Sequence, residues 1–129
     1  MKILLDTQCW LWMEAAPERL SAEARRVVQD GAHALYLSAA SAWEIAIKHA
    51  LGKLRLPVAP ERYVPSRMRR GRILPLPVQV EHGLRAGRLP PYHRDPFDRL
   101  LVAQAQLEGL TILTADPQLA AYEVPLIRA

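Results

Sequence analysis

The sequence predicts a single α/β domain with a largely parallel central sheet of four to five strands flanked by helices. Three observations lead to this class: short apolar runs alternate with helical patterns, polar residues end the runs, and no repeat or linker divides residues 1–129. Parallel neighbouring strands need crossover helices, so strands that alternate with helices favour a parallel sheet. A chain of 129 residues also has the length of one ordinary domain.

Five short apolar runs are expected to form the strands. They lie at residues 2–5, 34–37, 72–74, 110–113 and 124–127. The first run shows no alternation of polar and apolar residues, which is typical of a strand buried on both faces. Pro125 places the last run at an edge of the sheet, because proline cannot donate a hydrogen bond to a central ladder.

Helix signals follow most of these runs. They cover residues 10–12, 22–28, 42–51, 96–108 and a short stretch that starts at 117. Ser21 and Asp95 are expected N-caps, and Ser41 with Glu44 fits a capping box at the start of the third helix. Eight of the eleven prolines lie between residues 57 and 96, where they are expected to break the chain into short helices and loops.

Composition excludes several function classes. Hydrophobic residues make up 50% of the chain and charged residues 23%, which fits neither a disordered chain nor a membrane protein. No uncharged stretch is long enough for a membrane-spanning helix, and Asp6 comes too early for a signal peptide, so we expect a soluble, cytoplasmic protein with no membrane partner. The single cysteine, Cys9, excludes an internal disulfide and any zinc site with two or more thiolates. No glycine-rich phosphate loop or serine nucleophile elbow is present.

The net charge of +4 is unevenly distributed. Residues 53–94 carry ten Lys and Arg against two acidic residues, which leaves the rest of the chain at −4. A basic stretch beside an acidic remainder fits a polyanion-binding surface next to a cation-binding site. Solvated faces also produce runs such as Arg67, Arg69 and Arg70, so charge alone leaves both interpretations open.

Four acidic residues are expected to meet at one edge of the sheet. Asp6 and Asp116 follow the first and fourth strands, and Glu44 and Asp98 lie in the first turns of helices entered from the same edge. Ligand sites in open parallel sheets lie beyond the carboxyl ends of the strands. Crowded carboxylates either hold protons with raised pKa values or recruit a cation, and a hard divalent ion is the simpler answer. Mg²⁺ or Mn²⁺ prefers carboxylate and phosphate oxygens. The pattern therefore predicts metal-dependent hydrolysis of a phosphodiester.

Three of the four acidic residues could have a purely structural role at a helix start, whereas such a role is less clear for Asp6. Glu44 can close a capping box, Asp98 can favour the positive end of its helix, and Asp116 can cap a helix. Asp6 ends a buried strand, where a carboxylate has no comparable capping role, so a functional role is favoured there. The four histidines show no metal-ligand spacing, and His93 stands out only by its place beside the predicted edge.

Several segments of the chain resemble a known family. They are LLDT at 4–7, SAASAWEIAIK at 38–48, GKL at 52–54, HRDPFDRLLVAQA at 93–105 and LTAD at 113–116. In this order they resemble a PIN-domain ribonuclease of the VapC toxin type over nearly the whole chain. The resemblance implies a PIN-like fold and a Mg²⁺- or Mn²⁺-dependent endoribonuclease that acts on RNA. It also implies the toxin half of a type II toxin–antitoxin pair, usually a homodimer inhibited by a small VapB-like antitoxin.

The resemblance also assigns roles to particular residues. Asp6, Glu44 and Asp98 match the family's acidic triad, and Asp116 matches the position that often supplies a fourth acid. We expect Asp6 and Asp98 to hold the ion, Glu44 to bind it or a coordinated water, and Asp116 to complete the metal's ligands.

The neighbours of these acids are less clearly assigned. Thr7 and Ser38 could orient water at the metal or bond to loop backbone. Arg99 could meet phosphate or pair with a carboxylate. Gln8 and Cys9 depart from the family, in which His and an aliphatic residue are frequent, and this departure puts only the local pocket in doubt.

Two other function classes fit parts of the pattern. A non-catalytic RNA- or protein-binding module on the same fold would bind in a salt-dependent way, indifferent to EDTA and to loss of Asp6. A phosphoacceptor receiver domain also gathers acids beyond parallel strands. It needs a lysine after a late strand, however, and the only lysines are Lys2, Lys48 and Lys53.

Five large apolar residues point to a protein partner. The set consists of Trp10, Leu11, Trp12, Trp43 and Ile47. So many large side chains exceed what a small core can cover, which favours a groove for an antitoxin helix or a second subunit. The alternative is that all five are buried.

Overall fold

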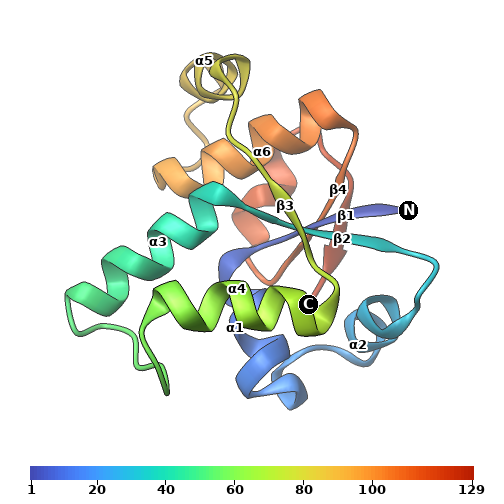
Figure 1. Ribbon diagram of the computed structural model, residues 1–129. Helices are drawn as coiled ribbons and strands as arrows, with labels where there is room; N and C mark the ends of the chain where they lie inside the picture. The colour runs from blue at the N-terminus through green and yellow to red at the C-terminus, as the bar shows by residue number, and fades with distance from the viewer.

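The computed structural model describes residues 1–129 and shows a five-stranded sheet with helices on both faces (Figure 1). The strands are β1 (Lys2–Leu5), β2 (Ala34–Ser38), β3 (Leu74–Leu76), β4 (Thr111–Thr114) and β5 (Leu126–Arg128). The α-helices are α1 (Thr7–Ala15), α2 (Ala22–Gln29), α3 (Ala39–Ala50), α4 (Pro60–Gly71), α5 (Val80–Arg88) and α6 (Pro96–Glu108). Two short 3₁₀ segments, η1 (Pro17–Arg19) and η2 (Pro117–Ala121), complete the elements.

The sheet is parallel throughout, with the strand order β3-β2-β1-β4-β5. This confirms the predicted α/β class and the parallel sheet. The chain proceeds from β1 to β2 and β3 on one side, while β4 and β5 lie on the other. The strand order therefore reverses between β1 and β4, and parallel sheets place their ligand sites at the carboxyl ends of the strands at such a reversal.

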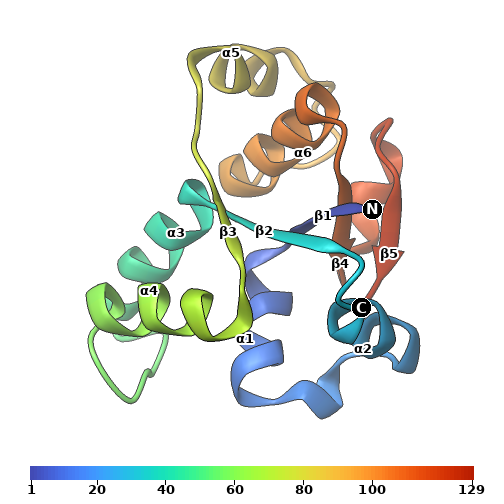
Figure 2. The same cartoon turned by 45° about the vertical axis from the view of Figure 1, so that its right-hand side comes forward.

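The side chains of β1 alternate between two apolar cores, one on each face of the sheet. Ile3 and Leu5 lie in the larger core with residues of α1, α2, α3 and α4, whereas Leu4 lies in the smaller core with residues of α6 and η2. All three side chains are fully buried, and each burial of this size contributes roughly 1.5–3 kcal/mol. Figure 2 shows α6 on one side of the strands and α1 and α2 on the other.

Helix caps lie where the sequence predicts them at three positions. The Ser21 side chain accepts from the backbone N–H of Ala24 at 3.0 Å, and the Asp95 carboxylate accepts from that of Phe97 at 2.8 Å. The Asp116 carboxylate likewise caps η2. The last strand is confirmed as an edge strand, one to two residues later than predicted.

The start of α3 differs from the prediction. The helix begins at Ala39, and the hydroxyl of Ser38 caps it by accepting from the backbone N–H of Ala40 at 3.0 Å. The predicted capping box of Ser41 and Glu44 is therefore wrong, because both residues lie inside the helix. Glu44 occupies the second turn rather than the first, which leaves its carboxylate free of any capping role.

The proline-rich segment contains longer elements than predicted. Helix α4 runs for 12 residues with Pro65 inside it and ends where Arg72 adopts a left-handed conformation with φ of 56°. The predicted strand at 72–74 lies two residues later, as β3. Pro75 is accommodated there because β3 is an edge strand.

The basic segment 53–94 does not form one surface. Its arginines lie chiefly on α4, on α5 and in the loops beside them. Figures 1 and 2 show these two helices at opposite ends of the molecule. No helix combines the length and the hydrophobicity that crossing a membrane would require.

Candidate active site

Asp6 lies between the carboxyl ends of β1 and β4, at the reversal of strand order. Its backbone N–H donates to the carbonyl of Leu113 at 3.0 Å, and the hydroxyl of Thr114 donates to its Oδ2 at 2.6 Å. Burial raises the pKa of the Asp6 carboxyl, the Thr114 hydrogen bond lowers it, and the charge of Glu44 raises it. A carboxylate is thus held at the end of a buried strand, with a hydroxyl fixing one oxygen.

Glu44 reaches the same edge from α3. Its side chain is buried, and Lys48, one turn later, places Nζ 2.8 Å from its Oε2. This hydrogen bond is the main reason that the pKa of Lys48 is raised. Lys48 is half-exposed, so it brings a positive charge to the rim of the acidic edge.

Asp98 and Asp116 meet at His93, which lies in the loop before α6. His93 Nε2 lies 2.9 Å from Oδ2 of Asp98 and 2.8 Å from Oδ2 of Asp116. Its Nδ1 accepts from the backbone N–H of Asp95 at 3.3 Å. In the neutral imidazole the proton therefore lies on Nε2, which makes His93 a donor shared by the two carboxylates.

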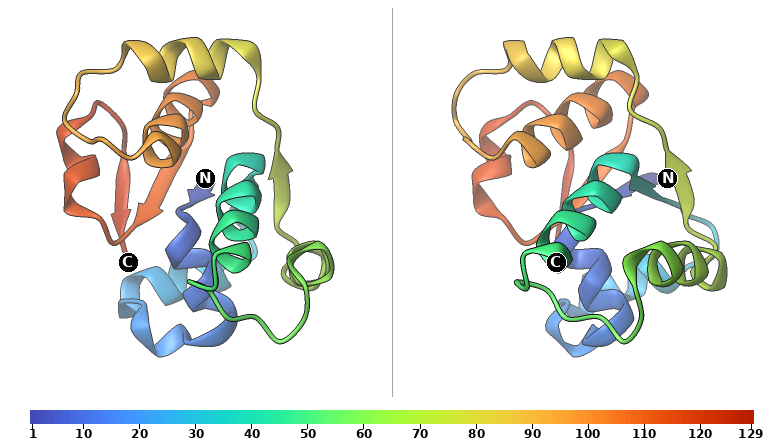
Figure 3. Two further views of the ribbon diagram at one scale, coloured as in Figure 1. Left: turned by 90° about the vertical axis from the view of Figure 1, so that its left-hand side faces the viewer. Right: turned by 60° about the vertical axis from the view of Figure 1, so that its left-hand side comes forward.

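The acidic residues perturb one another, which ties them into one site. Burial raises the pKa of Asp98 to about 7, and the charges of Asp6, Asp95 and Glu44 raise it too, while His93 lowers it. Helices α3 and α6, which carry Glu44 and Asp98, lie side by side at this edge (Figure 3). The predicted convergence of Asp6, Glu44 and Asp98 is therefore present in the structure.

The available oxygens distinguish Asp116 from the other acids. Its Oδ1 accepts from the backbone N–H of Gln118 at 2.9 Å and its Oδ2 contacts His93. In contrast, the hydrogen bonds of Glu44 and Asp98 engage only one carboxylate oxygen each. His93, Asp98 and Asp116 each bring a ligand atom within 4.8 Å of the others, in a group that could hold a metal ion. The free oxygens of Glu44 and Asp98 and the Asp6 carboxylate, at the same edge, are donors of the kind that hard divalent ions prefer. The residues present therefore fit a Mg²⁺ or Mn²⁺ ion.

The other predicted site residues have structural contacts. The Thr7 hydroxyl donates to that of Ser41 at 2.8 Å and thereby joins α1 to α3. Ser38 caps α3, which is the backbone role considered for it. The Arg99 guanidinium donates to four backbone carbonyls between residues 86 and 93, at 2.8 to 3.3 Å. It pairs with no carboxylate, and contact with phosphate stays a prediction.

Three residues of this edge received no role from the sequence. Lys48 could have been found from its i,i+4 spacing to Glu44, which is typical of a helical ion pair. Thr114 could have been found as the last residue of a strand that ends beside Asp6. His93 carries no local signal, because its contacts depend on the course of the loop before α6.

The apolar residues near the edge divide into buried and exposed members. Trp10 is fully buried, and Leu11 and Trp12 are half-buried against the larger core. Ile47 is also half-buried, whereas Trp43 is 65% exposed. The alternative in which all five are buried is therefore wrong, and the exposure is concentrated at Trp43.

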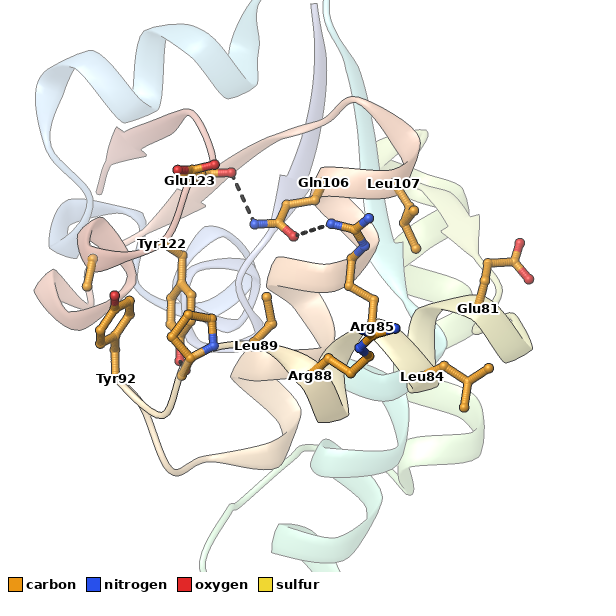
Figure 4. A pocket seen from close by; sticks show the side chains of 12 residues that line it. Glu81, Leu84, Arg85, Arg88, Leu89, Tyr92, Gln106, Leu107, Tyr122 and Glu123 are labelled. Atoms are coloured by element: carbon orange, nitrogen blue, oxygen red, sulfur yellow. Dashed lines mark hydrogen bonds between the residues drawn. The ribbon is translucent and has the colours of Figure 1, made fainter.

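A pocket of about 740 Å³ lies away from the acidic edge, between α5, α6 and residues 121–123 (Figure 4). Arg85 on its wall donates to Gln106 at 3.2 Å. The lining holds two arginines and two glutamates and includes none of the four predicted acidic residues. The clustered carboxylates, not this pocket, therefore define the candidate active site.

Comparison with known proteins identifies the class to which this fold and site correspond. The chain matches the family model described as PIN domain over residues 3–125. It therefore belongs to the PIN-domain family, as the resemblance of its motifs predicted. The curated relative Ribonuclease VapC16 of Mycobacterium tuberculosis is 50% identical over 76 residues, which cover 54% of this chain and 54% of that protein. The match thus spans about half the length of that relative.

Solved structures share the fold over almost the whole chain. VapBC2 from Rickettsia felis, in a crystal structure with a DNA fragment from its promoter, has a TM-score of 0.71 at 13% identity, covering 99% of this chain and 98% of that one. DNA-bound VapBC from Salmonella typhimurium has a TM-score of 0.69 at 17% identity, with the same coverages of 99% and 98%. At these identities the likeness shows the fold.

Proposed function

We propose that the protein is a cytoplasmic, Mg²⁺- or Mn²⁺-dependent endoribonuclease and the toxin of a type II toxin–antitoxin pair. The observation that carries the proposal is the meeting of Asp6, Glu44 and Asp98 at one edge of the sheet, where burial and then the charges of neighbouring acids raise the pKa of Asp98 to about 7. A bound cation would stabilise these carboxylates strongly, because it would offset the repulsion between their negative charges. The name of the half-matched relative supports RNA as the substrate.

Asp6, Glu44 and Asp98 would hold the ion, and Asp116 would complete its set of ligands. When bound, a divalent ion supplies a Lewis acid that activates water and offsets negative charge on the phosphate. The protein holds the carboxylates that would bind the ion in fixed orientations before the ion binds. Thr114 holds one oxygen of Asp6, and His93 holds one oxygen of Asp98.

Asp116 acts in this proposal through His93 as well as at the ion. Its carboxylate fixes the imidazole that orients Asp98, and hydrogen-bond partners of this kind tune a metal site from outside. Lys48 offsets the charge of Glu44 before the ion arrives and presents a cation to phosphate at the rim. These roles leave the reacting phosphate surrounded by groups from β1, α3, β4 and α6.

A VapB-like antitoxin and a second copy of the chain are the proposed partners. A solved structure that shares the fold is described as a toxin–antitoxin complex from Klebsiella pneumoniae, which supports an antitoxin as partner. Co-purification of a small partner that abolishes cleavage would support this part of the proposal. A protein that stays monomeric and fully active beside the product of its neighbouring gene would contradict it.

The decisive experiment is cleavage of total RNA with mapping of the new ends. Wild-type protein with Mg²⁺ or Mn²⁺ is expected to cut RNA, and EDTA is expected to stop it. Asp6→Asn, which keeps side-chain volume but removes ligand character, is expected to abolish cutting while the circular dichroism spectrum stays unchanged. The matched control is Asp30→Asn, because Asp30 is an exposed acid at the C-terminal end of α2 and is not one of the predicted site residues.

The result also separates nuclease from binding module. Salt-dependent RNA binding that is unaffected by EDTA and by Asp6→Asn, without cleavage, would favour a non-catalytic module on the same fold. Full cleavage by Asp6→Asn would show that the ion is held elsewhere.

A further inference from the structure

Two aromatic residues stand directly beside the acidic edge. Trp43 precedes Glu44 on α3, and Phe97 precedes Asp98 on α6. Their rings meet edge to face, with centroids 5.5 Å apart and an interplanar angle of 71°. The aromatic contact therefore bridges the two helices that supply two of the proposed metal ligands.

Packing of the core does not account for this pair. Neither Trp43 nor Phe97 belongs to either apolar core or to the residues packed against them. The larger core has its own aromatic contact, between Trp10 and Tyr63. Trp43 is 65% exposed, so most of the indole faces solvent although a tryptophan gains strongly from burial.

A positive charge completes the surface. Lys48 lies on the same helix, half-exposed, with its ammonium on Glu44. An exposed aromatic ring and a cation at the margin of a proposed phosphate site are groups with which proteins bind single-stranded nucleic acid. Bases stack on aromatic rings whatever their identity, whereas bases of a duplex are not available to do so.

We propose that Trp43, supported by Phe97, stacks on a nucleobase next to the scissile phosphate. The inference rests on the proposed ribonuclease function and adds a base subsite to it. A phosphate placed at the metal site that Asp6, Glu44 and Asp98 would form has its flanking bases at the surface beside those residues. Trp43 and Phe97, each one residue from a proposed ligand, form that surface.

A protein partner is the competing occupant. Trp43 and Ile47 on α3 and Leu51 at its C-cap recur at four-residue spacing, and Leu51 is also exposed. A partner helix docked on this stripe would contact all three of these residues. A base uses only the end that carries the edge-to-face pair and the acidic residues. Leu51 therefore offers a control on the same stripe, two turns away from the proposed subsite.

The test combines binding and cleavage in the full-length protein. Binding of a fluorescein-labelled single-stranded RNA and of its duplex is measured by anisotropy in the Asp6→Asn background, which leaves the strand intact. Trp43→Ala is expected to weaken single-strand binding at least about fivefold, Trp43→Phe to retain most of it, and Leu51→Ala to change nothing. The duplex is expected to bind more weakly than the single strand.

An abasic substitution locates the base. Removing the base on one side of the mapped cleavage site is expected to slow cleavage by wild-type protein, but to slow Trp43→Ala no further, because the stacking partner is already gone. Equal slowing of wild type and Trp43→Ala by each abasic position would overturn the inference.

The remaining outcomes distinguish failure of the base-subsite inference from failure of the proposed ribonuclease function. Cleavage by wild type together with unchanged binding and cleavage by Trp43→Ala refutes the base subsite and leaves the nuclease intact. Absence of cleavage by wild type refutes the proposed function, and the binding arm still decides whether Trp43 contacts RNA. A change of molecular mass by light scattering in both Trp43→Ala and Leu51→Ala assigns the stripe to a protein interface, against the inference.

Discussion

The hydroxyl of Thr114, the last residue of β4, donates a 2.6 Å hydrogen bond to Oδ2 of Asp6, the first residue after β1. The same hydroxyl accepts from the backbone N–H of Asp116 at 3.0 Å. Residues 108 positions apart are thus locked together at the point where the strand order reverses. One buried hydroxyl therefore sets both the direction of the central carboxylate and the entry into η2.

Replacement of Thr114 by Val is expected to damage both stability and cleavage. The change keeps the shape but leaves an oxygen of Asp6 and the N–H of Asp116 without a partner, which costs about 1–3 kcal/mol. Loss of such an orienting contact lowers metal affinity by ~10–100-fold. Urea unfolding and a Mg²⁺ titration of cleavage measure the two effects. Thr114→Ser, which retains the hydroxyl, is expected to stay close to wild type, and equal losses in both variants would contradict this role.

The raised pKa of Asp98 predicts how the metal-free protein responds to pH. Because the folded pKa of about 7 exceeds the unfolded value near 3.8, the protonated carboxyl favours folding. Its contribution to stability is complete below pH ~4 and is lost as the pH rises through 7. In EDTA, wild-type protein is therefore expected to lose more stability between pH 4 and pH 8 than Asp98→Asn, as thermal unfolding would show.

Added Mg²⁺ is expected to reverse this loss. At pH 8 the ionised carboxylates bind the ion, so Mg²⁺ raises the melting temperature of wild-type protein, and it raises that of Asp98→Asn much less. At pH 5 protons compete and the shift is smaller. Parallel pH dependence of wild type and Asp98→Asn would show that Asp98 does not carry the raised pKa.

Replacement of Arg99 by Lys distinguishes a structural role from contact with phosphate. One ammonium cannot reproduce the four hydrogen bonds to carbonyls of residues 86–93, so a loss of about 1–3 kcal/mol is expected in urea unfolding. Faster amide exchange in the loop before α6 is expected as well. Arg94→Lys, at an exposed neighbouring position, should leave the stability and the amide exchange of this loop unchanged.

The opposite result has a clear meaning for Arg99. Unchanged stability with a raised KM and a weaker salt dependence would show that the guanidinium meets the phosphate backbone instead.

The thiol of Cys9 is expected to be unreactive toward thiol reagents in the folded protein. Burial and the nearby charge of Asp6 raise the pKa of its thiol to about 12, so almost no thiolate exists at pH 8. Labelling with a thiol-specific chromogenic disulfide at pH 8 should be negligible in native protein and complete in guanidinium. Rapid labelling of the native state would show that α1 opens easily.

The sequence located the strand ends well because they are local features. Asp6 follows an apolar run whose burial on both faces is evident from its composition, and Asp95 precedes a proline at the first helical position. Their placement at one edge then follows from the parallel arrangement. The start of α3 could not be decided in this way, since both Ser38 and Ser41 are good N-caps. Pairing of Ser38 with Leu76 at the end of β2 makes it the cap and leaves Ser41 inside the helix.

By itself, the sequence determined the alternation of strands and helices, the parallel sheet and the acidic residues that follow its strands. Hydrophobic periodicity and capping chemistry act over a few residues, so they can be read without coordinates. Only the tertiary structure decided that His93 joins Asp98 to Asp116 and that Trp43 stays exposed beside Glu44. Such contacts depend on how loops and helices far apart in the chain pack together, and no local period encodes that packing.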